Sequence, residues 1–358
     1  MEQDFHGSYR PEQVQFLLKP ITLTPVADTA AKEALIQSGR KHYSEMLSPE
    51  YAPSARYLQL FHDACRLNGA RMADDCRRLA ALLARHRDTP PVLVSLARAG
   101  TPVGVIVREL LSRHYGASVA HYAISIIRDR GIDNNALHYI LARHPDQDIR
   151  FIDGWTGKGV ISRELTRFVS AFNQREHTRI STELHVLSDL AGTATAASSD
   201  DYLIPSAILN ATVSGLISRS VLNEHIGAHD FHGCVYYQEL AAHDLSQSFV
   251  DDILAHARGG LPAVQPVDPR AAARTSAAYL AHAKACYGID NDNLIKPGIG
   301  EATRVLLRRQ PERLIVRDPA DPAVAHLLQL ADEKHIAVHR DPELPYHAVS
   351  LIRSRTHA

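Results

Sequence analysis

The stretch from Ile149 to Leu165 constrains the fold most, because it combines a short apolar run, a glycine-rich turn and the start of a helix. The apolar run ends at Ile152, and one carboxylate, Asp153, follows it directly. The turn consists of Thr156, Gly157, Lys158 and Gly159. Glycines permit the positive φ values of an anion-binding nest, and a helix N-terminus carries about half a positive charge. The stretch therefore predicts a phosphate-binding loop at the end of a strand, with Asp153 placed to bind sugar hydroxyls.

Two common phosphate loops do not fit this spacing. A P-loop needs four residues between its first glycine and Gly-Lys-Ser/Thr, and the dinucleotide motif needs three spaced glycines. A strand-to-helix turn with a purely structural role remains the alternative.

Composition indicates a globular protein with room for two domains. The chain has 358 residues, of which 45% are apolar and 22% charged, and its formal net charge is -1. This balance gives no overall attraction to nucleic acids or membranes. The polar start and the lack of an apolar run of about 20 residues predict a cytoplasmic protein with no membrane partner. The four cysteines lack CxxC spacing and are expected to be reduced: Cys65, Cys76, Cys234 and Cys286.

The periodicity of the middle of the chain predicts an α/β fold with a parallel sheet. Apolar runs alternate with segments of helical periodicity, which is typical of strands joined by right-handed helical crossovers. In such a sheet the loops at the carboxyl ends of the strands share one edge, where ligands bind. The expected strands are 92–96, 119–127, 149–152 and 184–187, and the expected helices are 101–115, 133–143 and 159–175.

Four segments are expected along the chain. Residues 1–88 have helical periodicity after an irregular start and predict a helical N-terminal cap. The sheet domain covers 89–257 and includes a less regular substrate lobe from about residue 191. A Pro/Gly-rich linker and an Ala-rich helix occupy 258–290. Residues 291–358 alternate helix and strand and predict a small αβα domain.

Two further loops are expected at the same sheet edge. After the strand at 92–96, Arg98 can bind a diphosphate with its forked donors, while the backbone of Ala99 and Gly100 closes on the oxygens. Ser95 lies just before them and is a candidate substrate contact. The third loop carries Arg128, Asp129 and Arg130 and is expected to be mobile. An arginine on a solvated loop is the alternative to a site residue.

Three such loops resemble the type I phosphoribosyltransferases, over roughly residues 90–190. More narrowly, five strings resemble the StiP family of bacterial tellurium-resistance and stress-response gene clusters, whose members are regarded as phosphoribosyltransferase-like and are also labelled cysteine proteases. The strings are GSYRPEQVQFLLKPI (7–21), SLARAGTPVG (95–104), IIRDRGID (126–133), FIDGWTGKG (151–159) and DDYLIPSAILN (200–210). The resemblance implies a type I phosphoribosyltransferase-like parallel sheet.

The same resemblance implies transfer of a pentosyl group from phosphoribosyl pyrophosphate to a base-like acceptor, to make or salvage a nucleoside-like metabolite during stress. Arg98 and Asp153 would be catalytic, and the loop of Arg128, Asp129 and Arg130 would close over the leaving group. Mg²⁺ would bind mainly through the diphosphate, with Asp153 a candidate ligand. Most type I phosphoribosyltransferases carry two adjacent acidic residues before the phosphate loop, whereas Asp153 stands here between Ile152 and Gly154, so a single carboxylate would hold the ribose hydroxyls.

The acceptor side is less clearly encoded. Asp200 and Asp201 lie in a polar stretch that either contacts the acceptor or caps a helix. His229, Asp230, His232 and Cys234 match no zinc spacing and leave their roles open. A homodimer is expected.

The string from Gly298 to Arg304 resembles the Gly-x-Asn-Glu-x-Thr-Lys turn of pelota-like RNA-binding domains. The resemblance implies RNA contacts by Gly298, Glu301 and Arg304, although Gly300 replaces the asparagine. A docking or dimerisation module is the alternative, because the domain is nearly neutral overall.

Two other activities remain open. One is a cysteine protease-type hydrolase that uses Cys234 or another cysteine with a histidine such as His232. The other is a non-catalytic regulator that binds phosphoribosyl pyrophosphate or a nucleotide and signals through the C-terminal domain.

Overall fold

The computed structural model describes residues 4–28, 32, 35–36, 38–145, 148–308 and 311–352. An eight-stranded sheet forms its centre, and every strand pair in it is parallel except β4 with β5. The order is β1 (Gln15–Leu17), β4 (His121–Ile127), β3 (Val92–Ala97), β6 (Ile149–Ile152), β8 (Leu184–Asp189) and β7 (Trp155–Thr156), with β5 (Gly131–Ile132) beside β4 and β9 (Thr195–Ser198) beside β8. The predicted α/β class and parallel sheet are confirmed.

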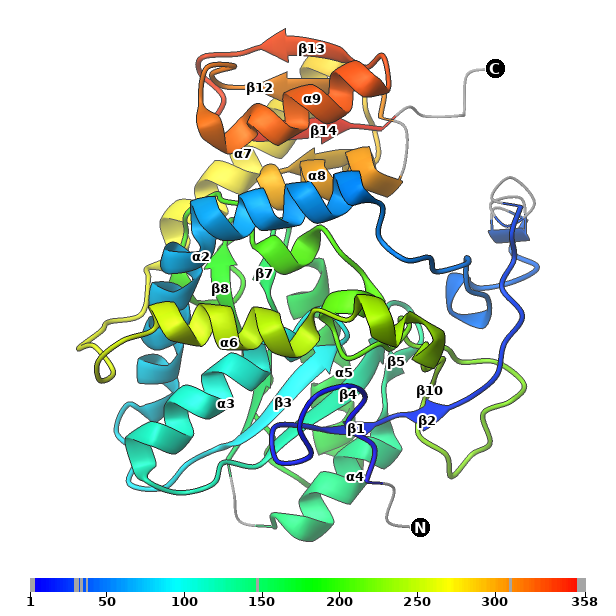
Figure 1. Cartoon of the computed structure of the whole chain (residues 1–358), viewed down its shortest axis with the longest axis vertical. Coiled ribbons are helices and arrows are strands. Elements are labelled where there is room, and N and C mark those ends of the chain that lie inside the picture. The colour runs from blue at the N-terminus through cyan, green and yellow to red at the C-terminus, as the bar shows by residue number, and fades with distance from the viewer. Residues whose placement is uncertain are drawn as a thin grey trace.

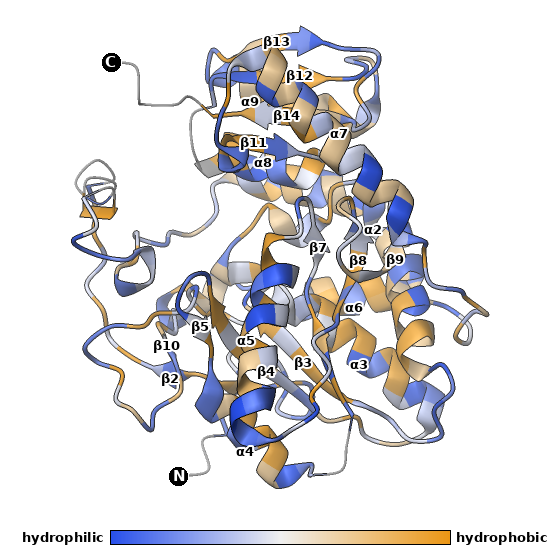
Figure 2. Ribbon diagram, turned by 180° about the vertical axis from the view of Figure 1, so that it is seen from behind, coloured by the Kyte–Doolittle hydropathy of each residue, from blue (hydrophilic) through white to orange (hydrophobic). Residues whose placement is uncertain are grey.

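Helices cover both faces of this sheet. The first face carries α2 (Ala55–Ala84), α3 (Thr101–Tyr115) and α6 (Ser246–His256), which lie in front of the strands in Figure 1. The second face carries α4 (Asn134–Arg143) and α5 (Val160–Glu176), which Figure 2 shows from behind. Strands buried on both faces need apolar residues throughout, which explains why their sequences read as continuous apolar runs.

Local signals set the helix boundaries that position the loops. Pro102 lies in the first turn of α3, and Gly116 ends that helix with a φ of 63°. Asp133 caps α4, because its carboxylate accepts a hydrogen bond from the N–H of Ala136. Gly159 has a φ of 68° immediately before α5, which a glycine adopts without strain. These signals are local, so the sequence predicted the three helices well.

The N-terminal region contains a long helix, as the sequence predicted, but also strands that the predicted helical cap lacks. Its strand β1 extends the central sheet, and β2 (Lys19–Pro20) pairs with β10 (Gly233–Cys234). The short helical turn η1 (Tyr43–Glu45) and the long helix α2 follow. A three-residue strand carries too little periodicity to be recognised, and its partner β4 lies about a hundred residues further along the chain. The lobe after residue 191 is irregular, as expected, with 3-10 turns η2 (Pro205–Ala207), η3 (Ala211–Val213) and η4 (Gln238–His243).

The C-terminal part forms a second, four-stranded sheet that lies at the top of Figure 1. Its strand order is β11 (Ile295–Pro297), β14 (Ala348–Leu351), β12 (Arg313–Val316) and β13 (Ala337–Arg340). The helical elements here are α7 (Pro269–Tyr287), η5 (Asp292–Leu294), α8 (Ile299–Arg308), η6 (Pro322–Val324) and α9 (Ala325–Glu333). The alternation of helix and strand that the sequence predicted from residue 291 is seen in α8, β12, α9 and β13, whereas β11 and β14, which pair antiparallel over long range, were not predicted. The expected tail of this domain, 353–358, lies outside the described residues.

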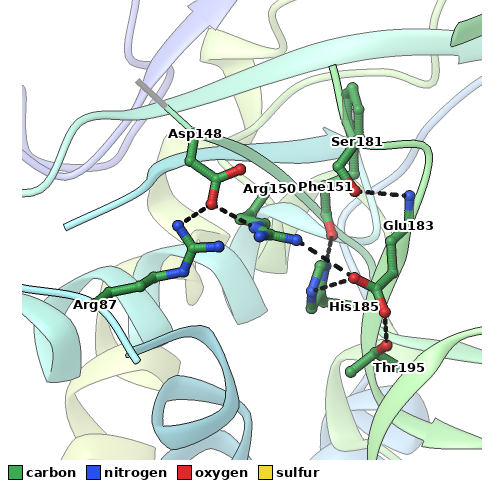
Figure 3. Close-up of polar contacts among 8 residues, drawn as sticks. All are labelled: Arg87, Asp148, Arg150, Phe151, Ser181, Glu183, His185 and Thr195. Carbon is green, nitrogen blue, oxygen red and sulfur yellow. Dashed lines mark hydrogen bonds and ion pairs between the residues drawn. The ribbon is translucent and has the colours of Figure 1, made fainter. Parts of the chain in front are cut away.

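A polar network joins the starts of β6 and β8, at the sheet edge opposite the loops of interest (Figure 3). Arg150 donates to Asp148 at 2.8 Å and lies 3.3 Å from Glu183, and Arg87 also pairs with Asp148. The Nδ1–H of His185 donates to the carbonyl oxygen of Phe151 at 3.1 Å. Burial lowers the pKa of His185 to about 4, so the ring is neutral at pH 7. This network ties the starts of β6 and β8 together, at the ends of the strands away from the predicted loops.

Candidate functional site

The glycine-rich loop lies where the sequence predicted it, between β6 and α5. Within it, Trp155 and Thr156 form the short strand β7 beside β8. The hydroxyl of Thr156 accepts a hydrogen bond from the N–H of Gly159 at 2.8 Å, which closes the turn. The loop is therefore a defined strand-to-helix connection.

The loop after β3 packs directly against the loop after β6. A Cβ atom on Gly100 would lie 2.5 Å from the carbonyl oxygen of Ile152 and 3.0 Å from the Cα of Asp153. Only glycine permits this approach, and the expectation that these two loops are neighbours is confirmed. Burial raises the pKa of Asp153 to about 6, while its hydrogen bond from the N–H of Gly154 and the charge of Arg304 act in the opposite direction.

The candidate arginines at this sheet edge are bound by carboxylates and a backbone carbonyl of the same chain. Arg98 donates to the carbonyl oxygen of Ile217 at 2.9 Å and lies 3.4 Å from Glu50, with both charged side chains mostly buried. Arg130 pairs with Glu45 at 3.0 Å. The segment around η1 thus covers this part of the sheet edge and supplies the carboxylates that pair with these cations.

The remaining residues of these loops have local structural contacts. Asp129 pairs with Arg128 at 3.3 Å, and β5 folds the end of this loop back onto β4. Ser95 is fully buried, and its hydroxyl lies 2.7 Å from Nε2 of His121. Ala99 and Gly100 take part in this loop through their backbone atoms.

Asp200 and Asp201 make different contacts within the chain. Asp200 forms an exposed ion pair with Arg71 at 2.5 Å. The two carboxylate oxygens of Asp201 accept hydrogen bonds from the N–H groups of Ile299 at 2.7 Å and His347 at 2.8 Å. Asp201 therefore caps α8 from outside the C-terminal sheet and joins the two parts of the molecule, which agrees with the capping alternative.

The turn that resembles pelota-like domains packs against the glycine-rich loop. A Cβ atom on Gly298 would lie 2.5 Å from Leu190, and one on Gly157 would lie 3.2 Å from Glu301. The guanidinium of Arg304 lies 4.7 Å from the ring centroid of Trp155. The first part of the molecule thus covers much of this turn.

The four cysteines differ sharply in accessibility. Burial raises the pKa of the thiols of Cys76 and Cys234, which are both fully buried. Burial, with the nearby charge of Asp252, raises the pKa of Cys65 to about 12. Cys286 is exposed near the end of α7, and its sulfur lies 3.5 Å from Nε2 of His282, one turn earlier. Buried apolar thiols are inert and accessible thiolates react, so Cys286 is the accessible candidate.

The cysteine and histidine cluster between residues 229 and 234 does not form a catalytic pair. Nδ1 of His232 lies 2.7 Å from the Ser125 hydroxyl, and its backbone N–H donates to Asp133 at 2.6 Å. Asp230 pairs with Lys19 at 2.7 Å. Within the part of the chain that the structure describes, no group of three or more His, Cys, Asp or Glu side chains is arranged to hold a metal ion.

Two cavities adjoin along α5. The larger has a volume of about 490 Å³ and the smaller about 280 Å³, and both are bounded by Arg163 and Thr193. Lys158 and Asp292 also line the larger cavity, and Arg167 lines the smaller. Lys158, Arg163 and Arg167 give the walls of these cavities positive charge. The cavities were not predicted from the sequence.

Comparison with known families divides the chain at the linker. Residues 7–254 match the family described as tellurite-like stress resistance cysteine protease StiP, and residues 274–354 match the PELOTA RNA-binding domain. A protein of Acinetobacter baylyi (strain ATCC 33305 / BD413 / ADP1) named "Cysteine protease StiP" is 43% identical over 370 residues, which cover 99% of this chain and 95% of that protein. This chain belongs to the StiP family.

A weaker structural likeness adds nothing to this assignment. A NifS-like protein from Rickettsia africae ESF-5 aligns over 96% of this chain and 94% of its own, with 13% identity and a TM-score of 0.20. A TM-score this low carries no argument about fold or function.

Membership of the StiP family corrects the predicted activity. The family model and the 43% identical relative are both named as cysteine proteases, which are hydrolases, so the prediction of a phosphoribosyltransferase that transfers a pentosyl group is wrong. The comparisons also give no support to a phosphoribosyltransferase-like fold, or to phosphoribosyl pyrophosphate and a base-like acceptor as partners. The roles of Arg98, Asp153 and the loop 128–130 in that reaction lose their basis, while anion binding by the glycine-rich loop stays a prediction.

Several other expectations keep the status of predictions. Mg²⁺ was expected through the diphosphate of the overturned donor, and the homodimer and cytoplasmic location are likewise untested. No helix in the described ranges is both long and apolar enough to cross a bilayer.

Proposed function

We propose that this chain is a cysteine-dependent peptide hydrolase of a stress response, with an RNA-binding C-terminal domain. The observation that carries the hydrolase is the relative named as a cysteine protease, because its 43% identity extends over nearly the full length of both chains. The StiP model alone stops at residue 254, before Cys286, whereas the alignment with the relative covers both parts.

The nucleophile is Cys286, and His282 is its base. A nucleophilic cysteine must be reachable by a peptide and must lose its proton to a nearby group. Cys286 meets both needs, since it is exposed and lies 3.5 Å from an imidazole nitrogen. Cys286 lies in the last turn of α7, away from the helix N-terminus, so the imidazole of His282 is the group that takes its proton.

The reaction then follows the usual course of thiol hydrolysis. His282 takes the proton of Cys286, and the thiolate attacks the peptide carbonyl carbon. The amine leaves with a proton from the imidazolium, which produces a thioester, and water hydrolyses the thioester to regenerate the thiol.

A mutational series tests the nucleophile directly. We expect Cys286→Ala and His282→Ala to abolish hydrolysis of an unfolded, fluorescein-labelled protein substrate. Cys65→Ala is the matched control, since it removes a half-buried thiol from another helix. Retention of full activity by Cys286→Ala would reject this assignment, and loss of activity in a folded Cys234→Ala variant would move the nucleophile into the segment that the StiP model matches.

RNA binding rests on the match of residues 274–354 to an RNA-binding domain. The test is a fluorescence anisotropy titration of the full chain with a labelled single-stranded RNA at two salt concentrations. Binding that weakens with salt supports contacts with phosphates. No binding at low salt would contradict this part of the proposal.

A further inference from the structure

The two cavities along α5 adjoin, since Arg163 and Thr193 line both of them, and we treat them together as one groove. Its walls are the first two turns of α5, the loop after β8 and one face of α7. Figure 2 shows α5 on the near side of the molecule, below β11 and α8. We call this feature the α5 groove.

Two of the three cations of the α5 groove, Lys158 and Arg163, donate hydrogen bonds to backbone carbonyl oxygens. The ammonium group of Lys158 donates to the backbone carbonyl of Asp292, and the guanidinium of Arg163 donates to the carbonyl of Lys158 at 3.0 Å. The carboxylate of Asp292 pairs with Lys284 at 2.6 Å. Burial, with the nearby charge of Lys296, lowers the pKa of Lys158 to about 8, as expected where cations gather without full compensation.

The cations are spaced along the groove. Arg163 and Arg167 are four residues apart on one helix, so they project from the same side about 6 Å apart along its axis. Both side chains are exposed. The guanidinium of Arg167 lies 4.9 Å from the ring centroid of Phe168 and 3.7 Å from the carboxylate of Glu164. A row of accessible cations beside an aromatic ring suits a flexible chain of phosphates and bases.

The α5 groove also reaches the domain that matches an RNA-binding family. Lys158 lies at its end, and the neighbouring Gly157 contacts Glu301 on α8. The turn of Gly298 and Arg304 packs against the loop that carries Lys158, so a nucleic acid bound at the exposed side of α8 lies beside this loop.

We propose that single-stranded RNA held by the C-terminal domain continues along the α5 groove, where Lys158, Arg163 and Arg167 bind its phosphates. This inference rests on the RNA-binding part of the proposed function and is independent of the hydrolase. It assigns a second RNA contact surface, on the segment that matches the StiP family.

The test is an anisotropy titration of the full-length chain with a labelled 20-nucleotide single-stranded RNA. The variant is the double substitution Arg163→Ala and Arg167→Ala, which changes exposed side chains only. We expect its affinity to fall roughly tenfold at low salt, and the slope of log K against log salt to become shallower by about 1 to 2.

Arg175→Ala is the matched control on the same helix. Arg175 is exposed, lies 5.4 Å from the ring centroid of Phe172 and pairs with Glu176, which reproduces the surroundings of Arg167 outside the groove. We expect the control to bind RNA as the unmodified chain does. Equal binding by the double variant and the control would overturn the groove and leave RNA binding intact. Absence of binding by the unmodified chain would overturn both, without bearing on hydrolysis.

Discussion

Replacing Asp201 by alanine should uncouple the two parts of the molecule. Its carboxylate accepts one hydrogen bond from the first N–H of α8 and one from the N–H of His347. Hydrogen bonds to a charged group are worth about 1.5 to 3 kcal/mol each, and alanine leaves both N–H groups without their acceptor. Burial raises the pKa of Asp201, so removal of the carboxylate recovers part of its desolvation cost. We expect a net loss of about 3 kcal/mol in the docking of α8.

Hydrogen exchange resolves this effect better than global unfolding, because a two-part molecule need not unfold in a single step. We expect the amides of the first turn of α8 to exchange roughly 100-fold faster in Asp201→Ala, since about 1.4 kcal/mol corresponds to a factor of ten. Asp200→Ala is the control, as its exposed pair with Arg71 is worth at most about 1 kcal/mol. Similar exchange in both variants, or none faster than in the unmodified chain, would refute the role of Asp201.

Three further predictions follow from burial. Burial lowers the pKa of His121 to about 4, against 6.5 when exposed, so its neutral ring contributes stability above pH 6.5 that is lost as the pH falls to about 4. In urea unfolding, we expect His121→Gln to reduce the change in unfolding free energy between these pH values by about 3 kcal/mol. The pH dependence that Asp153 contributes to stability has the opposite sign, because burial raises its pKa to about 6. Asp153→Asn should therefore stabilise the protein by about 2 kcal/mol at pH 8 and leave its stability unchanged at pH 3, and equal effects at both pH values would contradict a buried carboxylate. Gly298→Ala places a Cβ 2.5 Å from Leu190 at a φ of 87°, so thermal unfolding should show a loss of about 2 kcal/mol, whereas Gly260→Ala, in open space, should change little.

Local patterns carried most of the fold that could be predicted. The boundaries of α3 and of β6 agree with the expected ones because Pro102, Gly116 and a bounded apolar run are signals within a few residues. The strands β1 and β14 were missed because pairing with distant partners, rather than their own sequences, makes them strands.

The functional site shows a similar limit. The adjacency of Gly100 and Asp153 followed from the rule that parallel strands share an edge for their loops. The pairing of Arg98 with Glu50 and the capping of α8 by Asp201 depend on tertiary contacts that spacing does not encode. The glycine-rich turn before α5 is consistent with phosphate binding, but such a turn occurs in proteins of many functions and does not determine the reaction.

Cysteine reactivity has a weak trace in the sequence. The spacing of His282 and Cys286, four residues apart on a helix, places them on one face and was available from periodicity alone. What the sequence lacked was accessibility: it drew attention to Cys234 with His232, and only the structure shows that Cys234 is buried whereas Cys286 is exposed.

The most direct test of the account is to modify the thiols with a limiting amount of iodoacetamide and to measure residual hydrolysis and the labelled peptide by mass spectrometry. We predict that the label appears on Cys286 and that activity falls in proportion to it, while Cys76 and Cys234 stay unlabelled until the protein is denatured. Complete labelling of Cys286 with undiminished hydrolysis would contradict the central claim.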